Sequence, residues 1–138
     1  MRKLNVMIPV SVVMAAFVLF AFTIPQEQKK AGPWEIPAKY QKMTNPIKDD
    51  AASVNTGKML WGKYCKSCHG NIGKGDGPKA AQLKTFPGDF TTEAFKKGTD
   101  GELYYKSIIG RDEMPNFESK IPDENDRWAI VNYIRTLK

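Results

Sequence analysis

The sequence predicts a small all-α domain of about three to five short helices, and three observations support this. Segment 123–138 repeats apolar side chains at the i, i+3, i+4 and i+7 spacing of a helix. Runs that alternate apolar and polar residues, as strands do, are scarce. Glycine and proline recur after residue 69, as is typical of loops between short helices. The 138 residues allow one such domain with appendages.

Residues 1–24 are interpreted as an export segment. Arg2 and Lys3 precede a run without charge from Leu4 to Ile24, and a basic start before an apolar stretch is typical of an export signal. A run of about 20 apolar residues can also span a bilayer. The candidate cleavage site Ala21-Phe22-Thr23 fits the small-x-small pattern only loosely. We therefore expect a signal peptide or a retained membrane anchor, and in either case a periplasmic or otherwise exported domain.

Residues 25–52 are expected to form a proline-rich extended arm. Prolines 25, 33, 37 and 46 recur among polar residues, which disfavours helix and sheet. A plain tether is one interpretation. Several apolar residues, at a density unusual in a spacer, indicate instead that the arm docks onto the domain or onto a partner. These residues are Trp34, Ile36, Tyr40 and Met43.

The domain itself is expected over residues 53–138, with a first helix from about Asn55 to Cys68. Apolar residues follow the i, i+4, i+8 stripe along this segment. Gly57 and Gly62 are unfavourable inside a helix. We expect them where another helix approaches closely.

The only two cysteines and the only histidine of the chain lie together in Cys65-Lys66-Ser67-Cys68-His69. A C-x-x-C-H motif is typical of covalent c-type haem attachment. Residues three apart on a helix share a face, so both sulfurs can reach one edge of a porphyrin. The histidine that follows then ligates the iron as proximal ligand.

Three alternatives explain this motif less well. A thioredoxin-like redox pair requires a preceding strand and a βαβ pattern, whereas the residues before Cys65 predict a helix. A structural zinc site requires four ligands, and cysteine and histidine together supply three. A structural disulfide would leave His69 without a role.

At this motif the sequence resembles the class I c-type cytochromes, and the resemblance covers about residues 53–138. It implies a small all-α fold around one covalently bound haem. In that family the first and last helices cross at a glycine and an aromatic residue, which Gly57 and Trp61 would match. A loop proline in the family accepts a hydrogen bond from Nδ1 of the haem histidine through its carbonyl. Pro78 is the candidate for this role, and an ordinary turn proline is the alternative.

The sixth iron ligand is expected to be Met114, with a lysine or an open position as alternatives. A second histidine is absent from the chain, and four methionines lie before residue 53. Met59 shares a helix with Cys65 and is expected to fill the core. Met114 precedes a proline, which keeps it out of helical geometry. This Met-Pro segment also resembles the axial methionine segment of class I cytochromes c.

Two further helices and two loops complete the expected domain. The last helix is expected to begin at the N-cap Asp123, with Asp126 completing a capping box. Another is expected over 101–109, capped by Thr99 or Asp100 and ended by Gly110. The glycine-rich loop 70–78 lacks the ending of a phosphate loop. Segment 83–90 is expected to cover the lower haem edge.

The function expected from these residues is one-electron transfer. Two axial ligands leave no open position on iron, and no catalytic acid, base or nucleophile is apparent, so an enzyme is not expected. The resemblance implies a quinol-oxidising complex or dehydrogenase as donor and a terminal oxidase or reductase as acceptor. A fixed subunit of a larger respiratory complex and an open-site haem sensor or enzyme are the alternatives. The formal charge of +6 is spread along the chain without the basic block that marks nucleic-acid binding.

Overall fold

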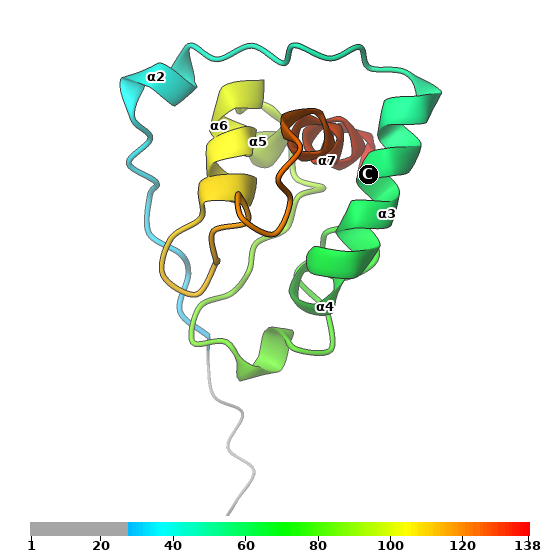
Figure 1. Cartoon of the computed structure of the whole chain (residues 1–138). Helices are drawn as coiled ribbons and strands as arrows, with labels where there is room; N and C mark the ends of the chain where they lie inside the picture. The colour runs from blue at the N-terminus through cyan, green and yellow to red at the C-terminus, as the bar shows by residue number, and fades with distance from the viewer. Residues whose placement is uncertain (1–27) are drawn as a thin grey trace, which may run out of the picture.

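The computed structural model describes residues 28–138 (Figure 1). The helices are α2 (Ala38–Gln41), α3 (Ala51–Tyr64), α4 (Lys66–His69), α5 (Glu93–Lys96), α6 (Asp100–Tyr104) and α7 (Glu124–Thr136). A 3₁₀ turn spans Ala80–Gln82, and a π-helix spans Tyr105–Ile109 directly after α6. Strands are absent from residues 28–138, which contain only two isolated bridges, Lys29 with Thr85 and Arg111 with Met114. The expected all-α class is confirmed.

The helices outnumber the expected three to five because α2, α4 and α5 are single turns of 4 residues each. The run 4–24, where an N-terminal apolar helix is expected, lies outside the described residues. Within the described part, no helix has the length and hydropathy that crossing a membrane requires.

The packing of α3 against α7 forms the centre of the domain (Figure 1). Gly57 lies at their contact, where a Cβ would overlap the carbonyl group of Ala129 and lie 2.8 Å from Cβ of Tyr133. Trp61, one turn further, is 2% exposed and packs 5.8 Å from the Tyr133 ring. The close approach expected at Gly57 is therefore present. The same expectation for Gly62 is wrong, because a Cβ there would meet nothing within 4 Å.

The apolar core is built from α3, α6, the π-helix, α7 and the loop that precedes α7. Its buried members include Trp61, Leu103, Tyr104, Ile108, Phe117, Trp128, Ile130, Val131 and Ile134. Met59 does not belong to it, since its 70% exposure contradicts the expected role as core filler. The helical stripe of α3 places residue 59 on the solvent side because Trp61 and Gly57 face α7.

Side-chain caps determine where the longer helices begin. Asp50 accepts a hydrogen bond from the Ser53 N–H at 3.0 Å, and the Ser53 hydroxyl accepts one from the Asp50 N–H at 3.3 Å. This capping box starts α3 several residues before the expected Asn55. The expected helix is also divided at Cys65, where φ of −111° separates α3 from α4.

The expected N-caps of α6 and α7 are both present, but the expected capping box of α7 is not. Thr99 caps α6 in a capping box with Glu102, and Gly110 follows the π-helix with φ of +70°. Asp123 caps α7 by accepting a hydrogen bond from the Asn125 N–H at 2.7 Å. The capping box expected with Asp126 is not formed.

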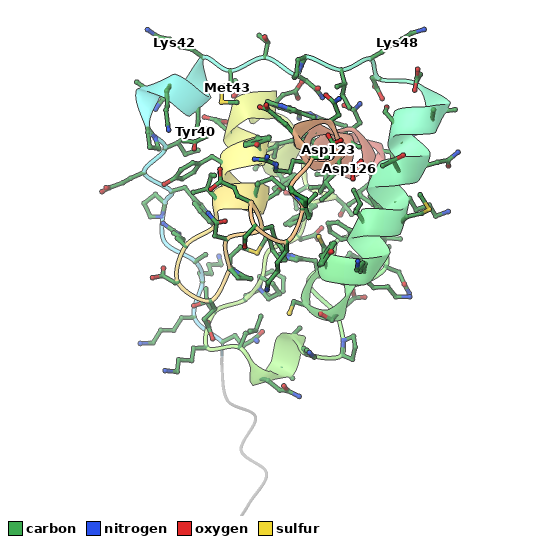
Figure 2. The ribbon with its side chains drawn as sticks, viewed as in Figure 1. Tyr40, Lys42, Met43, Lys48, Asp123 and Asp126 are labelled. Carbon is green, nitrogen blue, oxygen red and sulfur yellow. The ribbon has the colours of Figure 1, made fainter. Side chains whose placement is uncertain are left out.

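The arm, residues 28–50, wraps around the domain. In Figure 1 it climbs beside α6 to α2 and then crosses to the start of α3. Tyr40 packs 4.7 Å from the Tyr105 ring and 6.4 Å from the Tyr104 ring. Figure 2 shows Tyr40 and Met43 on the side that faces α6, whereas Lys42 points away. Of the two docking possibilities, the structure therefore shows contact with the chain's own domain.

Candidate cofactor site

A cavity of about 610 Å³ lies between α3, α4, segment 83–90, the loop after the π-helix and the arm. The sequence analysis named five residues for one site, and four of them line this cavity: Cys65, Cys68, His69 and Met114. Aromatic side chains of Trp61, Phe86 and Phe90 line it as well. Its volume falls within the range typical of sites for cofactors and other small ligands.

The imidazole of His69 is buried at the end of α4, with 7% of the residue exposed. The rings of Phe90 and Trp61 lie 4.7 Å and 5.8 Å away. Burial lowers the pKa of His69 to about 4, and an interaction with the Pro87 backbone carbonyl opposes this shift. The side chain is therefore neutral at pH 7, which leaves one ring nitrogen free to bind a metal ion.

The carbonyl that faces His69 belongs to Pro87, whereas the sequence suggested Pro78. Pro87 lines the cavity and Pro78 does not. The Nδ1 atom of His69 is buried and has no hydrogen-bond partner of normal geometry among residues 28–138, so the Pro87 interaction is not a complete hydrogen bond. Pro78 was suggested by the resemblance, because it lies in the loop that follows the histidine. The aromatic neighbours of Pro87, Phe86 and Phe90, were the signal that could have identified it.

Neither cysteine is in a disulfide. Cys65 is 6% exposed, and burial, with a smaller contribution from Cys68, raises the pKa of its thiol to about 12. The element before Cys65 is the helix α3, whereas a thioredoxin-like redox pair requires a preceding strand. No group of three His, Cys, Asp or Glu side chains gathers as a metal site in the described part of the chain.

Met114 lies in a tight turn between the π-helix and α7. Its N–H donates to the Arg111 carbonyl at 2.8 Å, and the side chain is half-buried against the core. Phe117, which is buried, ends the loop by donating its N–H to the Ile108 carbonyl at 2.8 Å. The loop thus holds the thioether of Met114 at the wall of the cavity.

Glu113 and Arg111, which the sequence analysis did not name, support this wall together with the arm residue Trp34. The Glu113 carboxylate accepts hydrogen bonds from the N–H groups of Lys84 and Thr85, each at 3.0 Å, and these bonds lower its pKa. Arg111 and Trp34 also line the cavity and contact each other. Their signal was weak, because a lone arginine in a loop and a tryptophan in an arm lie far apart in the sequence.

These residues fit a covalently bound haem. Two free thiols, a buried neutral histidine without a complete partner at Nδ1 and a methionine share one aromatic-lined cavity. Cysteine pairs attach haem, and histidine with methionine is an established axial pair for its iron. An all-α fold with this set of donors defines a c-type cytochrome domain.

The comparison with known families agrees with this class. The model of the family described as cytochrome c oxidase, cbb3-type, subunit III matches residues 52–134, and the chain belongs to this family. No curated protein matches the chain significantly. The protein therefore has a c-type cytochrome domain, which binds haem c covalently and serves haem-based electron transfer. The matched range contains Cys65, Cys68, His69 and Met114, whereas the arm lies before it.

Proposed function

We propose that the chain is a one-electron carrier that binds a single haem c, with His69 and Met114 as axial ligands. The observation that carries this proposal is that Met114 lines the same cavity as Cys65, Cys68 and His69. When bound, haem iron accepts and releases one electron, and a thioether ligand raises its reduction potential. The chain holds both ligands on buried or hydrogen-bonded backbone, which favours the same coordination in both oxidation states.

The walls of the cavity support a carrier more than an enzyme. Trp61 is fixed by a hydrogen bond of 3.1 Å from its Nε1 to the Gly70 carbonyl, and Phe90 stacks 4.3 Å from Phe95. These packed rings keep water away from the buried side of the cofactor. A haem shielded in this way suits one-electron transfer through its exposed edge.

The proposed setting is outside the cytoplasmic membrane, between respiratory redox partners. The electron donor would be a quinol-oxidising complex or a dehydrogenase, and the acceptor a terminal oxidase or reductase. The export segment 1–24 supports this location. It would leave the protein either free outside the membrane or tethered through residues 4–24.

A second candidate is a haem subunit fixed in a larger respiratory complex. The family description, which names a subunit of a cbb3-type oxidase, favours this possibility. A partner that copurifies at constant stoichiometry from solubilised membranes would support the fixed subunit. A chain that is recovered alone from the same membranes would support the mobile carrier.

The experiment that tests the axial ligands compares optical spectra of the holoprotein and of Met114→Ala. We expect the oxidised wild type to show the weak far-red charge-transfer band of an iron–methionine bond, and its reduced form to resist carbon monoxide. Met114→Ala should lose the band and bind carbon monoxide promptly. Met59→Ala, which removes an exposed methionine, is the matched control and should behave like the wild type.

Prompt binding of carbon monoxide by the wild type would contradict His/Met ligation. It would favour an open-site haem sensor or enzyme in place of the carrier.

A further inference from the structure

We infer that the arm segment 28–34 and Arg111 form a clamp that positions Met114, so that the arm is a working part of the haem site. This arm clamp goes beyond the proposed function but rests on it, because it requires Met114 to be an iron ligand. The clamp residues are Gln28, Lys29, Gly32, Pro33, Trp34 and Arg111. Gln28 begins the segment, and its Nε2 donates to the Leu83 carbonyl at 3.0 Å.

Arg111 connects the arm to the methionine loop through three contacts. Its Nη1 donates to the Pro33 carbonyl at 2.6 Å, and its Nη2 donates to the Gly32 carbonyl at 2.5 Å. The guanidinium lies over the Trp34 ring, 4.2 Å from its centroid. A guanidinium provides this planar pair of donors together with a face for stacking, which an ammonium group cannot.

The loop that carries Met114 depends on such outside contacts. From Arg111 to Asn116 every residue is exposed or half-buried, so the loop has no buried side chain of its own. Asp112 has φ of +49°, an uncommon conformation for a residue other than glycine. The loop therefore takes its position from its two ends and from the contacts of Arg111 and Glu113.

The arm and the loop share a second attachment on segment 83–86. The Lys29 N–H donates to the Lys84 carbonyl at 3.0 Å, and the Phe86 N–H donates to the Lys29 carbonyl at 3.0 Å. Glu113 accepts from the N–H groups of Lys84 and Thr85 on the same segment. The arm, segment 83–86 and the methionine loop therefore brace one another around the cavity.

The clamp also borders the cofactor cavity directly. Gly32, Trp34 and Arg111 line it together with Met114. The Trp34 ring packs edge-on against Tyr105, 6.2 Å between centroids, which anchors the arm to the start of the π-helix. Loss of the clamp would free the loop, and with it the thioether, to move away from the iron.

The test measures the iron–methionine bond in holoprotein variants of the clamp. In Arg111→Ala and Trp34→Ala we expect a weakened far-red band and binding of carbon monoxide to the reduced form about 10-fold tighter or more, the scale of outer ligand partners in metal sites. The midpoint potential should fall in both variants, because methionine ligation raises it. Trp34→Phe keeps an aromatic face under the guanidinium and should restore most of the band.

Arg135→Ala is the matched control. Arg135 also donates to two backbone carbonyls, those of Lys96 and Gly98, at 2.8 and 2.6 Å, but it does not line the cavity. We expect this variant to lose stability while it keeps the band and the resistance to carbon monoxide. A purely structural role for Arg111 would make the two arginine variants alike.

Each outcome separates the two proposals. If the wild type shows no iron–methionine band and binds carbon monoxide promptly, His/Met ligation fails, and the clamp fails with it. The wild type can instead show the iron–methionine band and resist carbon monoxide. If Arg111→Ala and Trp34→Ala then keep its band, potential and resistance to carbon monoxide, only the clamp is overturned. The clamp would also be overturned if Arg135→Ala lost the band and bound carbon monoxide to the same extent as Arg111→Ala.

Discussion

Two glycines of α3 differ completely in their surroundings. Gly57 lies so close to α7 that a Cβ would overlap the Ala129 carbonyl, whereas a Cβ at Gly62 would meet nothing within 4 Å. A glycine in a helix interior lowers stability relative to alanine unless close packing requires it. Gly57 is therefore needed for the helix crossing, while Gly62 is not.

This difference predicts opposite effects of the same substitution. Gly57→Ala should lower the free energy of unfolding by about 1–3 kcal/mol, because the added methyl overpacks the helix contact. Gly62→Ala should raise it by about 0.5–1 kcal/mol through helix propensity. Denaturant unfolding of the two holoprotein variants measures both values. A loss of equal size at both positions would contradict the role assigned to Gly57.

Single residues also show which parts of the site the sequence could predict. Cys65, Cys68 and His69 form a local motif, and its chemistry follows from residue type and spacing alone. The partner of His69 is not local, because it depends on how segment 83–90 folds back over the ring. Pro78 and Pro87 are therefore equivalent by residue type, and only the structure places Pro87 beside the imidazole.

The first turn of α7 depends on a single cap. The Asp123 side chain accepts from the Asn125 N–H, while Asp126 does not reach back to the cap backbone. Figure 2 labels both residues at the start of this helix. The two aspartates are three positions apart, but only Asp123 caps the helix.

We therefore expect Asp123→Ala to lower the free energy of unfolding by about 1 kcal/mol, a typical loss for an N-cap. Asp126→Ala should cost about 0.3–0.5 kcal/mol, through the weaker interaction of a carboxylate with the helix dipole. Thermal or denaturant unfolding of the holoprotein measures both. Equal losses would indicate that Asp126 takes part in a cap after all.

Among the elements, the two long helices were predictable because their apolar periodicity and caps are local signals. Their exact bounds were not, since Asp50 starts α3 early and Cys65 divides it from α4. The arm was the least predictable element. Its prolines indicated extended chain, but the contacts of Tyr40 and Trp34 with the π-helix depend on residues far along the sequence.

The molecule as a whole has a positive rim around the cofactor cavity. Seven basic side chains and two acidic ones line it. The basic residues are Lys29, Lys30, Lys63, Lys79, Lys106, Arg111 and Lys120, and the acidic ones are Asp112 and Glu113. An excess of one charge sign around a cleft attracts partners of the opposite sign.

This rim predicts how electron transfer responds to salt and to charge reversal. Reduction of the holoprotein by an anionic metal complex should slow as ionic strength rises, and reduction by a cationic complex should not. Lys79→Glu should slow the anionic reaction several-fold at low salt. Lys42→Glu changes the net charge equally but on a side chain that points away from the domain, so it should have little effect (Figure 2). Stopped-flow kinetics measure these rates, and equal slowing by both variants would contradict a local rim.

The arm contacts also bear on the order in which the protein is assembled. The chain from Gln28 to Trp34 leaves the ribosome well before its contacts at residues 80–86 and 111, which lie 52 to 79 positions further along. Contacts between such distant positions form late, because a long loop must first close. This wall of the cavity is thus completed only when residues 111–114 have come back to the arm. A chain that lacked the arm would therefore have the same cysteines and histidine in a cavity with one wall missing.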